Sequence, residues 1–154
     1  MRNVFFSFHY QRDIWRANVV RNSGAVIGES AAGFRDASLW EEAKKKGDRA
    51  IKNLIDEGLK GTTVTVVLIG METANRAYVT NEIEKSIERK NGLVGLRIHN
   101  IKDQNGRTDV MGSIPAKLSD GGYPTCTWTN CDDFAQWVET AYSAVQAKSR
   151  SWSL

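Results

Sequence analysis

The sequence has few cysteines and no long apolar run, and these shortages argue against several classes of protein. Cys126 and Cys131 are the only cysteines among 154 residues, and neither histidine is near them in the sequence. A zinc site or a disulfide scaffold is therefore not favoured, and we expect reduced thiols and no bound metal. No apolar run reaches the length of a membrane span, and the N-terminus lacks the apolar region of a signal peptide. These absences predict a soluble cytoplasmic protein with no membrane contact.

The chain also has little excess charge of either sign. Its formal charge of +3 is compatible with an anionic ligand but does not indicate nucleic-acid binding. The run of lysines at residues 44–46 has no interleaved aromatic residue, so a solvated face is the better interpretation. The hydrophobic fraction of 41% and the length fit a single domain over residues 1–154, with a sizeable core.

The chain is organised around residues 62–87. Residues 63–69 are a run of β-branched and aliphatic residues closed by a glycine, which predicts a strand buried on both faces of a parallel sheet. A helix is predicted over residues 76–90, with Val79, Ile83 and Ile87 as its core stripe. Glu82 lies beside that stripe, near the carboxyl end of the strand, where open α/β sheets bind ligands. On spacing alone, an ordinary solvated helix residue is the commoner interpretation of Glu82.

The N-terminal part predicts a strand, a helix and a second short strand. The apolar strand at residues 4–8 lacks a polar face, which is typical of a central position in a sheet. A helix over residues 12–22 follows, and a short strand is predicted at residues 25–27. The glycine spacing of residues 28–33 resembles a phosphate loop but lacks its Lys-Ser/Thr, so we expect a flexible loop. Ile14, Trp15, Asn18 and Val19 lie along one side of the predicted helix at residues 12–22.

The remaining chain completes an alternation of strands and helices. Helices are predicted from Leu39 to near Lys46, from Asp48 to Gly58 and over residues 132–148, with strands at 93–98 and 124–128. Between these strands, residues 99–123 form a long polar segment whose length is typical of a functional loop. This order predicts an α/β fold with a mostly parallel sheet, helices on both faces and the flavodoxin-like strand order 2-1-3-4-5. His9, Tyr10 and Glu82 would then lie close together.

Several spaced motifs resemble one known family. Residues 4–8, Val-Phe-Phe-Ser-Phe, resemble the first motif of TIR domains, and Tyr78-Val79-Thr80-Asn81-Glu82-Ile83 resembles the TIR helix motif W-C-x-x-E-L. The chain is more similar still to the TIR-like proteins of bacterial Thoeris anti-phage systems over residues 3–98, through the blocks at 4–10, 30–33, 36–41 and 67–70. The TIR loop after the second strand, with its Arg-Asp and Pro-Gly signature, is absent, and residues 99–123 match nothing in that pattern.

The resemblance implies an enzyme that consumes NAD. Members of this family cleave the bond between nicotinamide and ribose, and many cyclise the remaining ADP-ribose into a signal that activates an effector protein. NAD is then a substrate and no further cofactor is implied, and a homo-oligomer is left open. The resemblance makes Glu82 the catalytic residue. The substrate-binding residues that we expect are Phe8, His9, Tyr10, Arg12, Asp36 and Tyr78.

The residues supply what this chemistry needs. Nicotinamide leaves NAD as a neutral group, so a single carboxylate that stabilises the positively charged ribose could suffice where ordinary glycosidases use two. Aromatic candidates to flank the rings are Phe8, Tyr10, Tyr78 and Trp40. The start of the first helix, with Arg12 and Arg16, could bind the pyrophosphate, and Arg35 and Arg76 are alternatives. Core packing for Phe8 and Trp40, a helix cap for Asp36 and surface positions for the arginines are equally open.

Two other functions fit the same fold. A non-catalytic TIR-like interaction module would keep the apolar motifs without needing Glu82. A flavin or nucleotide-binding domain is also compatible, because this fold supports many functions. The long segment at 99–123 could serve as a lid in an enzyme, an interpretation that rests on its length.

Overall fold

The computed structural model describes residues 1–31, 34 and 38–152. This part of the chain contains twelve elements of secondary structure. The predicted strands and helices are among them, with small shifts in their first and last residues. They are β1 (Asn3–Ser7), α1 (Tyr10–Arg21), β2 (Ile27–Glu29), α2 (Ser38–Lys46), α3 (Asp48–Leu59), β3 (Val64–Ile69), the 3-10 turn η1 (Thr73–Asn75), α4 (Ala77–Glu88), β4 (Gly92–Arg97), α5 (Ala116–Asp120), β5 (Thr125–Thr127) and α6 (Cys131–Trp152).

The strands form a parallel sheet in the order β2-β1-β3-β4-β5. β1 and β3 are direct neighbours, with Val4 opposite Val64 and Ser7 opposite Val67. All six residues of β3 are buried, as expected for a strand covered on both faces. The predicted fold class and strand order are confirmed, and so is the prediction that β1 and β3 are adjacent and parallel.

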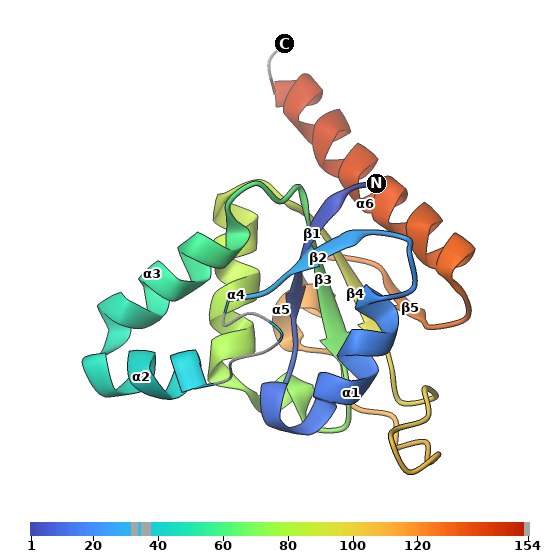
Figure 1. The fold of residues 1–154 in the computed structure, drawn as a ribbon. Coiled ribbons are helices and arrows are strands. Elements are labelled where there is room, and N and C mark those ends of the chain that lie inside the picture. Colours follow the sequence, from blue (N-terminus) through green and yellow to red (C-terminus); the bar gives the residue numbers. More distant parts are fainter. Residues whose placement is uncertain (32–33, 35–37, 153–154) are drawn as a thin grey trace.

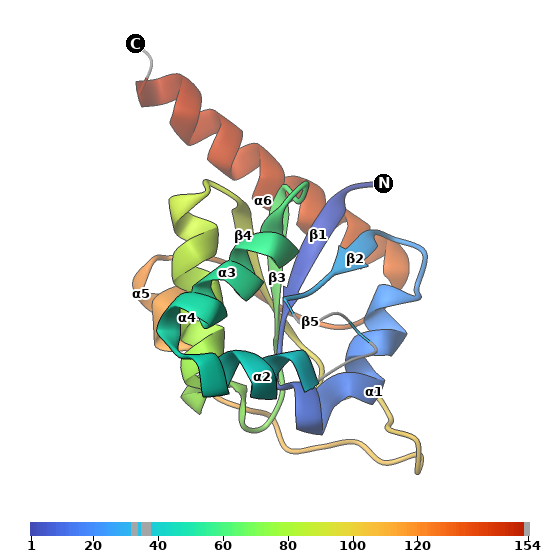
Figure 2. The ribbon, with the colours of Figure 1, turned by 60° about the vertical axis from the view of Figure 1, so that its left-hand side comes forward.

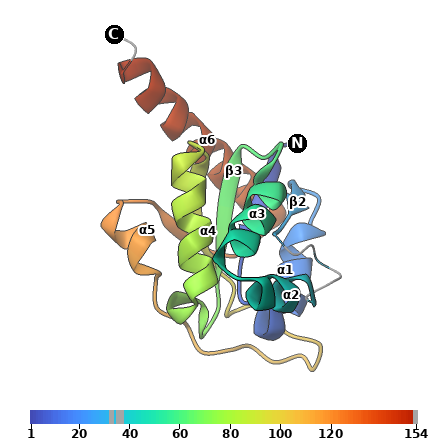
Figure 3. The ribbon, with the colours of Figure 1, turned by 90° about the vertical axis from the view of Figure 1, so that its left-hand side faces the viewer.

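Helices cover both faces of this sheet. α1 and α6 lie on one face, and α3, α4 and α5 lie on the other (Figures 1 and 2). Seen onto the second face, α4 crosses in front of β3, with α3 and α5 on either side (Figure 3). α2 lies near the carboxyl end of the sheet, beside the start of α1 (Figure 2). The apolar residues of β1, β3 and β4 therefore face helices on both sides and form the centre of the core.

The buried side of α1 is not the side with its largest apolar residues. Trp15 is 50% exposed and Val19 is 39% exposed, whereas Asp13 and Arg16 are buried against the body of the protein. The buried side of α1 therefore differs from the side that carries Trp15 and Val19. Apolar spacing did not indicate this orientation, because two of the inward-facing side chains are charged.

Three further boundaries differ from the sequence-based expectation. β2 lies at Ile27–Glu29, two residues beyond the predicted strand, and so includes the start of the predicted loop. The 99–123 segment contains a short helix, α5, so the 99–115 loop is its only long irregular part within the described residues. α6 begins one residue earlier and extends to Trp152, and its C-terminal half projects past the strands (Figures 1 and 2). In the part of the chain that the structure describes, no helix is both long and apolar enough to cross a membrane.

Candidate active site

Glu82 and Ser7 meet at the carboxyl end of the two central strands. Ser7 is the last residue of β1, and its hydroxyl donates a hydrogen bond of 2.6 Å to Oε1 of Glu82 on α4. Both residues are 0% exposed, and Oε2 of Glu82 has no hydrogen-bond partner among the described residues. The interpretation of Glu82 as a solvated helix residue is therefore wrong. Half of this carboxyl group is held in place, and the other half is a buried acceptor without a donor.

Polar contacts between α4 and the strand region set the phase of the helix. The Ser86 and Thr65 hydroxyls lie 2.6 Å apart, and the amide of Asn91 donates to the Thr65 hydroxyl at 3.3 Å. Val79, Ile83 and Ser86 are buried with Glu82, whereas Ile87, predicted to be in the core stripe, is 41% exposed. The inward face thus includes two polar residues that hydrogen-bond to β1 and β3, and this places Glu82 on it.

Burial governs the ionisation of Glu82. Desolvation raises the pKa of its carboxyl well above the ordinary value, and the hydrogen bond from Ser7 opposes this rise only in part. Among the described residues, a negative charge at this position has no counter-charge or second donor to compensate for the lost water. The carboxylate form is therefore favoured when a positively charged or hydrogen-bonding partner contacts Oε2.

Aromatic rings form a connected cluster beside this carboxyl group. The centroids of Phe8 and Tyr10 lie 4.4 Å apart, those of Tyr10 and Trp40 lie 6.1 Å apart, and those of Trp40 and Tyr78 lie 4.8 Å apart. Glu82 and Tyr78 are one turn apart on α4, and burial raises the pKa of Tyr78 to about 12, so its phenol stays neutral. The cluster combines rings from β1's end, α1, α2 and α4 into one apolar wall.

His9 joins the end of β1 to the start of α1. Its Nδ1 accepts a hydrogen bond from the backbone N–H of Arg12 at 3.3 Å and so caps the helix. Desolvation and the nearby Arg76 lower the pKa of His9, which favours the neutral ring. Because Nδ1 is the acceptor, the remaining proton is on Nε2, which is the nitrogen free to donate to a ligand.

The cavity among these side chains is small. It measures about 60 Å³ and is lined by His9, Tyr10, Trp40, Arg76 and Tyr78, with three more residues of α1 and α2. Nε1 of Trp40 and Nε of Arg76 are buried without a hydrogen-bond partner among the described residues. A dinucleotide needs a pocket of several hundred Å³. The cavity is far below that volume, and two buried polar atoms beside it lack partners among the described residues.

Two of the three arginines of α1, Arg12 and Arg16, contact the 99–115 loop. Arg12 donates to both carboxylate oxygens of Asp109, at 2.8 and 3.1 Å, and forms an ion pair with Glu72 at 3.4 Å. Arg16 is 6% exposed and donates to the backbone oxygens of Ile101 and Arg107. Arg16, expected to be a candidate for pyrophosphate binding, thus serves in this conformation to hold the loop. Arg12 lies at the rim of the site, with Asp109 in its fork.

Sequence reasoning missed Ser7 and Asp13. Ser7 could have been found, because it is the single polar residue of the apolar run at residues 4–8. Asp13 is 1% exposed and neither carboxylate oxygen has a hydrogen-bond partner among the described residues. It lies against Gly70, directly after β3, and no signal in the sequence distinguishes it from an ordinary acidic residue in the first turn of a helix.

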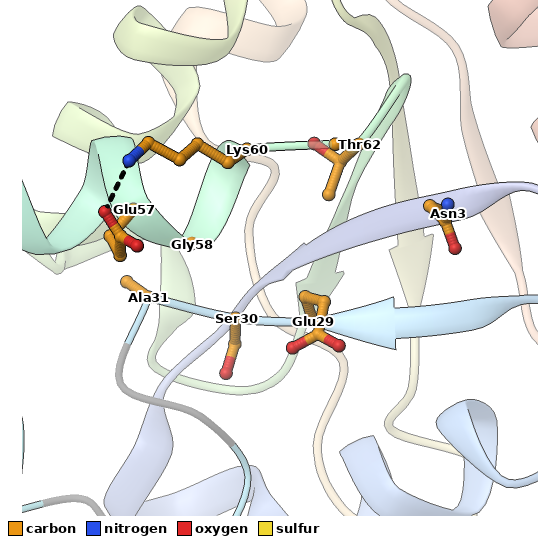
Figure 4. Close-up of a pocket in the computed structure, with 9 residues that line it drawn as sticks. Asn3, Glu29, Ser30, Ala31, Glu57, Gly58, Lys60 and Thr62 are labelled. Carbon is orange, nitrogen blue, oxygen red and sulfur yellow. Dashed lines mark hydrogen bonds and ion pairs between the residues drawn. The ribbon is translucent and has the colours of Figure 1, made fainter.

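A wider hollow lies elsewhere on the molecule. Its volume is about 420 Å³, and it is lined from Asn3, β2's end and the segment between α3 and β3 (Figure 4). Lys60 and Glu57 pair within it at 2.8 Å (Figure 4). Asn3 and Thr62 mark the amino ends of β1 and β3, opposite the carboxyl ends at which parallel sheets bind ligands. We therefore assign the candidate site to the smaller cavity beside Glu82.

The structure brings together most of the predicted site residues. Phe8, His9, Tyr10, Tyr78 and Glu82 lie at one end of the sheet, with Arg12 at the rim. The remaining predicted residue, Asp36, and the alternative Arg35 lie outside the described residues. Within the described residues, no three His, Cys, Asp or Glu side chains are placed to bind a metal ion together.

Comparison with known proteins identifies the family. Residues 5–103 match the family described as Thoeris protein ThsB, TIR-like domain. The chain is 52% identical over 116 residues to "Putative cyclic ADP-D-ribose synthase ThsB1" of Bacillus cereus (strain MSX-D12). That match covers 74% of this chain, and the chain spans 60% of the length of the relative. Residues 5–103 contain α4 and the aromatic residues Phe8, Tyr10, Trp40 and Tyr78. The chain therefore belongs to the TIR-like domain family of Thoeris protein ThsB.

Proposed function

We propose that this protein cleaves the nicotinamide–ribose bond of NAD and converts the ADP-ribose part into a cyclic signal nucleotide. The observation that carries this proposal is the buried Glu82, with one oxygen held by Ser7 and the other without a partner. The name of the Bacillus cereus relative, a cyclic ADP-D-ribose synthase, supports the same reaction. In a Thoeris system the product would activate a separate effector protein, and the NAD consumed would be that of the cytoplasm.

The first step breaks the bond between C1 of the ribose and the nicotinamide nitrogen. The bonding electron pair leaves with nicotinamide, which changes from a cation to a neutral molecule, so no general acid is needed. Positive charge then develops on the ribose. A carboxylate of Glu82 facing that ribose would stabilise this charge and accept a hydrogen bond from a ribose hydroxyl through Oε2. Ser7 would keep Oε1 fixed and leave Oε2 for the substrate.

The second step forms a new bond at the same carbon. A nucleophilic group of the adenosine part attacks C1, and any proton it carries passes to solvent or to a nearby base. If water attacks in its place, linear ADP-ribose results. The apolar wall of Phe8, Tyr10, Trp40 and Tyr78 would favour cyclisation by excluding water from the charged intermediate. Neutral His9 could donate a hydrogen bond from Nε2 to an oxygen of the substrate.

Substrate binding requires the site to open. The closed cavity of about 60 Å³ cannot hold a nicotinamide ring with its ribose. Trp40 is the only large aromatic residue of the cluster on α2, and a shift of this helix would enlarge the cavity without disturbing the sheet. The pyrophosphate would then lie toward Arg12 at the rim. No metal or further cofactor takes part in this proposal.

The test is incubation of the purified protein with NAD, followed by chromatography for nicotinamide, linear ADP-ribose and cyclic products. Glu82→Gln keeps the shape of the side chain and removes its charge, so we expect folding to persist and turnover to fall by about 100-fold or more. Glu84→Gln is the matched control, because Glu84 lies on the same helix, is exposed and pairs with Lys117 at 3.4 Å. Its turnover should stay within twofold of the wild type.

Other outcomes would favour other functions. Equal loss of turnover in the two variants would contradict the assignment of Glu82. A folded wild-type protein that leaves NAD intact, both alone and with extracts of phage-infected cells, would favour a non-catalytic interaction module. Copurification of a yellow chromophore would favour a flavin-binding domain.

A further inference from the structure

The carboxylate of Asp109 binds Arg12, which is linked through Glu72 to Arg76 in the lining of the cavity. Two N–H···O contacts, at 2.8 and 3.1 Å, join one terminal nitrogen of Arg12 to the two oxygens of Asp109, and a nitrogen of Arg16 lies 3.6 Å from the same carboxylate. The Asp109 side chain is only 15% exposed. A guanidinium group binds carboxylates and phosphates through the same donors and similar geometry. Asp109 therefore fills a site that would suit a phosphate group equally well.

The residues that follow Asp109 in the 99–115 loop are exposed. Val110 and Met111, directly after Asp109, are 65% and 59% exposed. Asp103, at the opposite end of the turn, accepts hydrogen bonds from the backbone of Asn105 and Arg107, so this turn is held by its own contacts. The loop returns to the body at Gly112, which lies against the backbone of Gly70. The backbone N–H of Asp109 also donates to the carbonyl oxygen of His99 at 2.8 Å. The Asp109 side chain could therefore leave Arg12 by a change of rotamer while its backbone stays attached to the body of the protein.

The closed loop also lies near an unsatisfied carboxyl group. Asp13 lies against Gly70 in a buried position, and neither of its oxygens has a hydrogen-bond partner among the described residues. The negative charges of Asp109 and Glu72 both oppose its ionisation. A closed loop therefore maintains an electrostatic cost that would fall if Asp109 moved away. In this structure the loop is closed. Moving Asp109 away from Arg12 would remove one of the negative charges that oppose the ionisation of Asp13, and this partly offsets the loss of the ion pair with Arg12.

We propose that Asp109 occupies the pyrophosphate-binding position of the site and that the pyrophosphate of the dinucleotide displaces it from Arg12. This inference rests on the proposed function, because it takes NAD as the ligand. The charge balance favours such an exchange, since a pyrophosphate carries two negative charges where Asp109 carries one. Arg12 would be the main ligand, and Arg76, linked to Arg12 through Glu72, lies at the same rim. No covalent step is involved.

The exchange predicts that removing the charge of Asp109 strengthens the binding of anionic ligands. Asp109→Asn keeps the size of the side chain and its hydrogen bond to the backbone of Val110. We expect this variant to bind ADP-ribose and inorganic pyrophosphate about 3- to 10-fold more tightly than the wild type in calorimetry, the scale of one partly exposed ion pair. The KM for NAD should fall by a similar factor.

Asp103→Asn is the matched control. It removes the same charge from the same loop, 3.9 Å from Arg16 rather than from Arg12, and an asparagine oxygen can still accept the two backbone hydrogen bonds. Its affinity for both ligands should stay within twofold of the wild type. Equally tighter ligand binding in both variants would show that the effect comes only from the lower negative charge of the loop. That result would overturn the proposal.

A second variant makes the test specific for Arg12. Arg12→Ala should weaken binding of both ligands, and Asp109→Asn should then have no further effect in the Arg12→Ala background. Circular dichroism confirms folding of each variant, and Asp109→Ser provides a second substitution at the position if Asp109→Asn does not fold. Unchanged or weaker binding in folded Asp109 variants would refute the exchange.

Failure of the inference can be distinguished from failure of the proposed function. Binding of ADP-ribose and pyrophosphate is measured without turnover. A protein that cleaves NAD with the same KM in the wild type and in Asp109→Asn contradicts the exchange alone. A protein that shows the expected binding pattern but leaves NAD intact contradicts the proposed function and supports an anion site at Arg12.

Discussion

Replacement of Asp13 by asparagine should make the protein more stable at neutral pH than at acidic pH, relative to the wild type. Burial raises the pKa of Asp13 from the ordinary 3.8 to about 6, and the nearby Arg12 and Arg16 offset this rise only in part. Between these two values the folded state keeps a proton that the unfolded state has lost, so wild-type stability falls as the pH rises. Asparagine has a similar shape, carries no charge at any pH and is free of this effect.

The magnitude follows from the size of the rise. Each unit of pKa corresponds to about 1.4 kcal/mol, so the rise amounts to about 3 kcal/mol of unfolding free energy. The unfolding free energy of the wild type, relative to that of Asp13→Asn, should fall by this amount between about pH 4 and pH 6.5. It should change little above pH 6.5. Glu82 also titrates with a raised pKa, but it does so in both proteins and cancels in the comparison. For a domain of this length, 3 kcal/mol corresponds to roughly 6–12 °C in Tm.

The assay is urea unfolding of both proteins at several pH values from 4 to 8. The difference in unfolding free energy between Asp13→Asn and the wild type should increase across that range and then level off. Asp120→Asn, at the exposed end of α5, is the control and should change stability by no more than about 0.5 kcal/mol at every pH. A difference for Asp13→Asn that is constant with pH would show that the Asp13 carboxyl is hydrated or paired, and would refute the argument that it is buried without partners.

Two further variants test the centre of the site. Ser7→Ala removes the hydrogen bond that lowers the pKa of Glu82, so the acidic limb of the kcat–pH profile should move to higher pH and turnover at pH 7 should fall by about 10-fold; an unmoved profile would contradict the role of Ser7. Gly70→Ala would place a methyl group against the carboxylate of Asp13 and should cost about 1–3 kcal/mol in urea unfolding. The same change in an Asp13→Ala background should cost much less, and an equal cost in both would show that the two residues are not in contact.

The order of the sheet could be predicted because its strands have a simple physical signature. β3 is a continuous run of buried β-branched and aliphatic residues, and such runs occur in parallel sheets covered on both faces. The alternation with helices then leaves few ways to connect the strands. The short edge strand β2 was misplaced by two residues, because three residues with one buried position carry almost no pattern.

The phase of the helices could be predicted only in part from apolar spacing, which correctly placed Val79 and Ile83 in the core. On α4 the buried residues are Val79, Glu82, Ile83 and Ser86, and on α1 they include Asp13 and Arg16. These polar residues face inward because of partners that are distant in the chain. Glu82 meets Ser7, 75 positions earlier, and Arg16 donates to Ile101, 85 positions later. A single sequence does not show which distant residues pair. The resemblance to TIR domains indicated Glu82 as the catalytic residue, where spacing favoured a solvated residue.

The unsatisfied polar atoms near the carboxyl end of the sheet form a consistent group. Oε2 of Glu82, both oxygens of Asp13 and Nε1 of Trp40 are buried without hydrogen-bond partners in the described part of the chain. Each such atom costs roughly 1–3 kcal/mol, and a structure selected only for stability would replace it with an apolar group. Under the proposed function, a ligand that supplies donors and positive charge would satisfy these atoms. We propose that Trp40 in the aromatic wall and Asp109 on the 99–115 loop move when that ligand binds beside Glu82.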